Sequence, residues 1–133
     1  MTASEVALDS WAWWEVLTDT AKGRRLSKKY LEREEARVHT SAITIAEITA
    51  KLAALDRRAD IAPIVQAISG KGRVHEVSTD IAELAGPLRD DLRRTNRSAS
   101  LADAIVLITA RKLGVDLVSA DPAFSGHPDV TPD

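Results

Sequence analysis

Short apolar runs alternate along the chain with longer segments of helical spacing, and this alternation is the feature that most limits the fold. Strand-like runs are predicted at residues 6–8, 37–40, 74–77 and 117–120. Strands separated by helices pair in parallel, with helices on both faces of the sheet. The sequence therefore predicts an α/β fold, a three-layer α/β/α sandwich with a mainly parallel central sheet.

Helices are predicted from apolar periodicity and from the residues that begin or end a helix. Gly114 favours a helix end, and Pro87 predicts a kink or break in its helix. One helix is expected to bury a stripe that includes Ile48, Leu52 and Leu55, and the highly charged segment 19–37 is expected to be an exposed helix. The predicted helices cover residues 11–17, 19–37, 41–55, 60–69, 80–94 and 100–113.

With 133 residues, the chain has the usual length of one domain, and we expect a single domain over residues 1–133 with a weakly ordered tail from about residue 125. The absence of cysteine excludes a disulfide framework and a thiolate metal site, and the three histidines have no metal-binding spacing. Any bound metal would therefore depend mainly on oxygen ligands, which suit Mg²⁺ or Mn²⁺.

The N-terminal segment lacks the basic region and long apolar core of a signal peptide, and no apolar run is long enough to cross a bilayer. We therefore expect a cytoplasmic protein that does not associate with membranes. The net charge of −2 neither indicates nor excludes nucleic-acid binding, because a cluster of acids that binds cations distorts the charge count.

Two acidic residues, Asp9 and Asp121, follow predicted strands directly. The carboxyl ends of parallel strands meet at one edge of the sheet, where α/β proteins bind their ligands. Asp103 and Glu47 lie near helix starts, in surroundings that are mostly apolar. If both helix starts face that edge, four carboxylates converge, and their repulsion raises their pKa values or requires cations. Two divalent ions about 3.5–4 Å apart form the arrangement that hydrolyses phosphodiester bonds.

Helix capping is the alternative role for two of these acids. Ser100 and Asp103 match the capping box, in which the acid accepts a hydrogen bond from the N-cap backbone, and so do Thr44 and Glu47. The same pattern occurs at residues 2–5, where no helix is expected, so the pattern is weak. Capping is favoured for each acid considered alone, whereas the apolar surroundings favour a charged cluster that binds metal.

Four stretches surround the four acids in an order and spacing that span nearly the whole chain. They are VALDSWAWWEVL around Asp9, TSAITIAEI around Glu47, SLADAIVLITARKLG around Asp103 and DLVSADPAF around Asp121. Together they resemble the PIN-domain nucleases, and most closely the toxin half of VapBC toxin–antitoxin pairs. The resemblance implies a parallel sheet between helices and an endoribonuclease that depends on Mg²⁺ or Mn²⁺ and hydrolyses RNA. It also implies a homodimer and a small antitoxin protein as partner.

The resemblance assigns roles to particular residues. Glu47 would bind or orient a second metal ion and the attacking water. Two features depart from the family: Pro122 stands where a charged residue is common, and Gly86-Pro87 interrupts a helix that is usually smooth. The implied catalytic and metal-binding residues are Asp9, Glu47, Asp103 and Asp121, with Ser10 and Ser119 supporting them.

Basic residues near the acids are candidates for binding the RNA phosphates. Arg93, Arg94 and Arg97 precede the Asp103 helix directly. A solvated helix face is an equally good interpretation for these arginines, and a better one for the basic groups at residues 22–29.

Three of the five aromatic residues of the chain are Trp11, Trp13 and Trp14, within one short helix. An anchor in the core or in a subunit interface is the favoured interpretation, and at least one indole is expected to pack against a second copy or an antitoxin. A platform on which nucleobases stack is the alternative.

Two other enzyme classes place an aspartate at the end of an early strand. A haloacid-dehalogenase-like phosphatase needs a second aspartate two positions later, where this chain has Trp11, and a receiver domain needs adjacent early acids and a late lysine that are missing. The alternative that stays open is a PIN-like RNA-binding or regulatory subunit of an RNA-processing complex that does not cleave.

Overall fold

The central element of the protein is an entirely parallel sheet, seen in a computed structural model that describes residues 5–32, 37–119, 121, 124 and 130–131. The strand order is β3-β2-β1-β4-β5, so the first strand of the chain lies at the centre. The five strands found in these ranges are β1 (Glu5–Leu8), β2 (Arg37–Ser41), β3 (Gly72–His75), β4 (Asp116–Val118) and β5 (Val130–Thr131).

Helices connect β1 to β2, β2 to β3 and β3 to β4, and they cover both faces of the sheet. Two of the helical elements are short and irregular. The element η1 is a π-helix that continues α2, and η2 is a 3-10 turn before α4. The bounds are α1 (Ser10–Leu17), α2 (Ala21–Leu26), η1 (Ser27–Leu31), α3 (Ala42–Ala54), η2 (Arg58–Asp60), α4 (Ile61–Lys71), α5 (Thr79–Arg93) and α6 (Leu101–Leu113).

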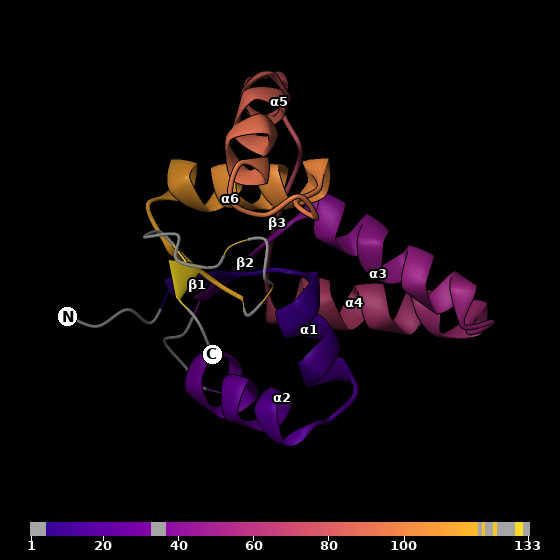
Figure 1. Cartoon of the computed structure of the whole chain (residues 1–133). Helices are drawn as coiled ribbons and strands as arrows, with labels where there is room; N and C mark the ends of the chain where they lie inside the picture. The colour runs from indigo at the N-terminus through magenta and orange to yellow at the C-terminus, as the bar shows by residue number, and fades with distance from the viewer. Residues whose placement is uncertain (1–4, 33–36, 120, 122–123, 125–129, 132–133) are drawn as a thin grey trace.

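Side chains of the central strand alternate between two hydrophobic cores. Ala7 packs in a core with residues of α5 and α6, whereas Val6 and Leu8 pack in another with residues of α1, α2, α3 and α4. Figure 1 shows α5 and α6 together on one side of the sheet and α1 and α2 on the other. This alternation is the period of two that a strand imposes on its side chains. The predicted three-layer sandwich is therefore confirmed.

Local capping explains where two of the site-bearing helices begin and end. The Ser41 hydroxyl accepts from the backbone N–H of Ile43 at the start of α3, and Ser100 caps α6 in the same way through Asp103. Gly114 ends α6 with a φ of 69°, a left-handed conformation that glycine adopts without strain.

Three features of the helices differ from the sequence prediction. Helix α5 runs without a break through Pro87, because Pro87 and Glu83 both lie on its exposed side, where the carbonyl that loses its partner can reach water. Leu55 is 53% exposed, since α3 ends before it. The charged segment after residue 19 is not wholly exposed, because Leu26 and Tyr30 are buried in the core.

The end of the chain contributes one strand that was not predicted. Val130–Thr131 pairs in parallel with β4, although residues 125–129 of the expected tail lie outside the described residues. No helix in the described ranges combines the length and hydropathy that a membrane span requires.

Candidate active site

Asp9 lies directly after β1, where the chain turns into α1. Its side chain accepts a hydrogen bond of 2.8 Å from the backbone N–H of Ala12 and caps that helix, and the residue is only 5% exposed. Burial raises the pKa of Asp9 to about 7, although hydrogen bonds from Ser119 and Ala12 act in the opposite direction. The charges of Asp121 and Asp103 contribute to this increase. Asp9 is therefore a carboxyl group whose charged form is poorly stabilised.

Ser119 connects the ends of β1 and β4. Leu8 and Val118 are paired in the sheet, so Asp9 and Ser119, the next residue of each strand, lie side by side. The buried Ser119 hydroxyl bonds to the Asp9 carboxylate and also accepts from the backbone N–H of Asp121 at 2.9 Å. One hydroxyl thus fixes the positions of two of the predicted acids.

Asp103 performs the capping role and also belongs to the acid cluster. Its Oδ2 accepts from the Ser100 backbone N–H at 2.8 Å, and its own N–H donates to the Ser100 hydroxyl at 3.0 Å, which completes a capping box. Burial and the charge of Asp121 nevertheless raise its pKa, against the lowering effect of the Ser100 hydrogen bonds. The two predicted roles of Asp103 are therefore compatible.

Glu47 reaches the cluster from the second turn of α3. Burial raises its pKa, a hydrogen bond from Ser10 lowers it, and the charges of Asp103 and Asp121 raise it. The predicted capping box between Thr44 and Glu47 is wrong, because α3 already begins after Ser41 and Thr44 lies inside the helix.

Four elements thus bring the predicted acids into electrostatic contact at the carboxyl edge of the sheet. Asp9, Glu47 and Asp103 each interact with the charge of Asp121, and Glu47 interacts with Asp103. The structure also brings Ser10 and Ser119 into hydrogen bonds with this cluster. All these ligand atoms are oxygens, which matches the preference of hard divalent cations.

The cluster offers the type of ligand atom that a divalent metal ion prefers, but its side chains are not already arranged around such an ion. In the part of the chain that the structure describes, no group of three or more acidic or histidine side chains is positioned to hold a metal ion as it stands. Thr44 lies one turn before Glu47 on the same helix, and its buried hydroxyl has no hydrogen-bond partner among the described residues. A cation bound at the cluster would offset the mutual repulsion of its acids.

A groove of about 340 Å³ adjoins the acid cluster between α1 and α3. Ser10 and Glu47 belong to both the cluster and the groove. The groove is lined by Ser10, Trp11, Trp14, Glu15, Glu47, Ile48 and Lys51. Lys51 was not singled out by the sequence analysis, although its position four residues after Glu47 would place both on one helix face.

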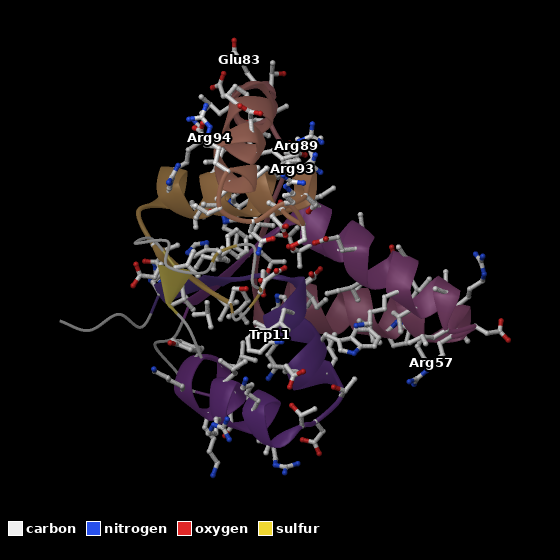
Figure 2. All side chains as sticks on the ribbon, viewed as in Figure 1. Trp11, Arg57, Glu83, Arg89, Arg93 and Arg94 are labelled. Atoms are coloured by element: carbon white, nitrogen blue, oxygen red, sulfur yellow. The ribbon has the colours of Figure 1, made fainter. Side chains whose placement is uncertain are left out.

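The three tryptophans of α1 have different environments. Trp13 is 1% exposed and donates its indole N–H to the Thr40 hydroxyl at 2.9 Å, so it belongs to the core. Trp11 and Trp14 are half-buried and pack only partly against that core. Figure 2 shows Trp11 beside α1, on the opposite side of the sheet from α5.

The three predicted RNA-binding arginines do not form one surface. Arg93 donates through Nε to the carbonyl of Ala99 at 2.8 Å, which supports the loop before α6. Arg94 lies 3.9 Å and 3.8 Å from two carboxylates of α5, and Figure 2 shows it on the opposite side of that helix from Arg89 and Arg93. Arg97 is exposed beyond the end of α5.

Solved structures of similar fold cover almost the whole chain. A toxin–antitoxin complex from Klebsiella pneumoniae is 25% identical, with a TM-score of 0.66 and 95% of each chain covered. VapC20 of Mycobacterium tuberculosis, a toxin that cleaves the sarcin–ricin loop, is 23% identical with a TM-score of 0.73, covering 94% of this chain and 96% of that one. DNA-bound VapBC from Salmonella typhimurium is 17% identical with a TM-score of 0.71, covering 97% and 96%.

Sequence comparison gives a family match and no individual relative. No curated protein matches the chain in sequence. The family model of the PIN domain matches residues 6–129, which contain all four acids and both serines of the cluster. The chain therefore belongs to the PIN domain family.

Proposed function

We propose that this protein is an endoribonuclease that depends on Mg²⁺ or Mn²⁺. The observation that carries the proposal is the burial of Asp9 beside two other carboxyl groups, Asp103 and Asp121, an environment that raises its pKa to about 7. A buried acid surrounded by other acids is unfavourable unless a cation neutralises it. The environment therefore favours a protein that completes this site with metal.

Each side chain of the cluster has a distinct task in this proposal. Asp9, Asp103 and Asp121 hold the metal, and Glu47 orients the attacking water toward the phosphorus atom. Ser119 fixes Asp9 and Asp121, and Ser10 fixes Glu47. When bound, a divalent ion would make water more acidic and would offset the negative charge that develops on the phosphate oxygens. No histidine is needed as a general base.

We further propose that the protein is the toxin of a toxin–antitoxin pair. The support comes from the solved structures with similar folds, which include toxin–antitoxin complexes from three bacterial sources. An antitoxin would then be its protein partner, a homodimer its assembly and cytoplasmic RNA its substrate. The low sequence identities leave the particular RNA and the particular antitoxin to experiment.

Cleavage of total cellular RNA tests the proposal directly. Purified protein is incubated with the RNA in Mg²⁺, in Mn²⁺ or in EDTA, and new RNA ends are mapped. We expect discrete new ends with metal and none in EDTA. Asp121→Asn is expected to abolish them, whereas Asp91→Asn, which changes an exposed acid on α5, is expected to leave them unchanged. RNA that binds but stays intact in every metal would favour the non-cleaving RNA-binding role instead.

A further inference from the structure

We propose that the groove between α1 and α3 is a nucleobase-binding subsite, in which Trp11 stacks on a base next to the scissile phosphate. This inference rests on the proposed function, because it presumes an RNA substrate. It specifies where on the protein one nucleotide of the RNA would bind and which interaction would hold its base.

The position of the groove links it to the reacting phosphate. Ser10 of α1 and Glu47 of α3 both line the groove and also belong to the acid cluster. Trp11 is the residue that follows Ser10, and Lys51 lies one helical turn beyond Glu47. A phosphate held at the acids would therefore place an adjoining nucleotide over these two residues.

The two indoles that line the groove are held in place but not enclosed. Trp11 and Trp14 are three residues apart on α1, so they lie on the same helix face. Both are half-buried against the core that contains Trp13, and both still line the groove. A fixed aromatic surface of this kind binds a base at little entropic cost, and its stacking is tolerant of sequence.

Cationic groups accompany both indoles. The Lys51 Nζ lies 4.3 Å from the ring centre of Trp14, and the Lys22 Nζ lies 5.1 Å from that of Trp11. Both side chains are flexible and carry positive charge beside an aromatic surface, which is the combination found in sites for single-stranded nucleic acid. Glu15 also lines the groove, and its carboxylate accepts from the Thr20 hydroxyl at 2.7 Å.

A nucleotide explains these features better than a peptide segment. An apolar peptide would offer no anionic group to Lys51, which lines the groove, whereas a nucleotide would place a flat base on the indole and a phosphate near Lys51. A segment of a partner protein is the competing occupant, and the experiment separates the two.

The first experiment changes the RNA and leaves the protein intact. Single-stranded oligonucleotides that contain one mapped cleavage position are made with a single abasic site at successive positions around it. We expect kcat/KM of the wild-type protein to fall about 10-fold for one abasic position beside the cut and little elsewhere. A profile in which no position changes the rate more than 2-fold would overturn the subsite.

The second experiment assigns the effect to Trp11. Trp11→Leu is expected to lower kcat/KM on intact RNA about 10-fold and to remove the penalty of the abasic position, because the stack is already absent. Trp11→Phe, which keeps an aromatic face, is expected to retain most of the activity. Lys51→Gln is expected to weaken RNA binding in EDTA, whereas Lys112→Gln on α6 serves as its matched control.

The outcomes distinguish this inference from the function on which it rests. Wild-type protein that neither binds nor cleaves RNA would overturn both. Normal cleavage by a folded Trp11→Leu variant, with an unchanged abasic profile, would overturn the subsite alone. If that variant loses only the binding of a protein partner, the groove is a protein interface and the nucleobase proposal is wrong. If Trp11→Leu does not fold, the abasic profile of the wild-type protein decides.

Discussion

Two clusters of polar side chains on the same sheet differ in whether their members complement one another. In one, His39 joins three strands, with Nε2 2.6 Å from the Glu5 carboxylate and Nδ1 2.8 Å from Nε2 of His75. The pKa of Glu5 is lowered, chiefly by its hydrogen bond to His39. In the other, Asp9 has hydrogen-bond donors but also two acidic neighbours, and its pKa is raised to about 7.

The difference shows how a structural polar group can be separated from a functional one. Glu5 has a partner of complementary chemistry. Hydrogen bonds join Glu5 to His39 and His39 to His75, so each of these three side chains has a partner within the group. Asp9 and its two acidic neighbours carry the same sign of charge, and their repulsion adds to the cost of burying Asp9. Acids whose pKa is raised by burial and by other acids are therefore the better indication of a site.

The largest expected effect is the loss of RNA cleavage in Asp121→Asn. An amide is a poor ligand for a hard cation, and a metal ion contributes several kcal/mol to stabilising the transition state, so kcat/KM should fall at least about 1,000-fold. Glu5→Gln should keep the wild-type rate in the same assay, because Glu5 belongs to the complementary cluster. Equal losses in the two variants would erase the distinction between the clusters.

The next effect is on the pH dependence of stability without metal. The pKa of Asp9 rises from 3.8 in the unfolded chain to about 7 in the folded protein. Between these values the folded state binds more protons than the unfolded state, so the contribution of Asp9 to stability falls by a few kcal/mol as pH rises from about 4 to 7. Denaturant unfolding in EDTA should show this decrease in the wild-type protein and a much smaller one in Asp9→Asn. Parallel profiles would mean that Asp9 is not the group responsible.

A smaller effect, with a diagnostic sign, is expected for Asp103→Asn. Asn keeps an oxygen that can accept from the Ser100 backbone, so little of the capping energy of about 1 kcal/mol is lost, whereas the repulsion from Asp121 is removed. The metal-free melting temperature should be unchanged or higher, and the stabilisation by Mg²⁺ should be smaller. A clearly lower melting temperature with unchanged metal affinity would reduce Asp103 to a helix cap.

The smallest effect is expected for Glu5→Gln, and its sign is opposite. The lowered pKa of Glu5 means that its charged form is stabilised in the folded protein, by the hydrogen bond to His39 above all. The amide substitution should therefore lower the melting temperature slightly at neutral pH. The difference should shrink as the pH falls below 4.5, the ordinary pKa of the group, and disappear below the lowered pKa of Glu5 in the folded protein, where the wild-type side chain is protonated as well. A more stable Glu5→Gln variant would contradict the complementary character of this cluster.

Sequence periodicity was sufficient to predict the layers and the edge at which the acids meet. Residues 6–8 and 117–118 lie within paired strands, and the capping residues of α6 are where the pattern put them. These features are local or follow from the general rule for parallel strands. The start of α3 agrees with the predicted helix over residues 41–55, but the capping pattern of Thr44 and Glu47 is not used, because Ser41 is the N-cap.

Contacts between distant residues could not be predicted in the same way. Two of these contacts depend on how α1 lies against α3: the hydrogen bond from Ser10 to Glu47 and the approach of Lys51 to Trp14. The hydrogen bond from Ser119 to Asp9 depends on the pairing of β1 with β4. Nor does the sequence pattern show that the tolerated proline of α5 faces outward. Such contacts are set by the tertiary arrangement, which no local pattern encodes.

The central position of β1 has a consequence for the time during synthesis at which the acid cluster is assembled. Asp9 is made first, but β4, which pairs beside β1, and Asp121 are made more than 100 residues later. Parallel strands pair only after the long intervening segment has folded, and such distant pairings form slowly. A growing chain therefore carries the early acids long before it can bring the late ones to them. Under the proposed function, the enzyme would stay inactive during synthesis until Asp121 has been made.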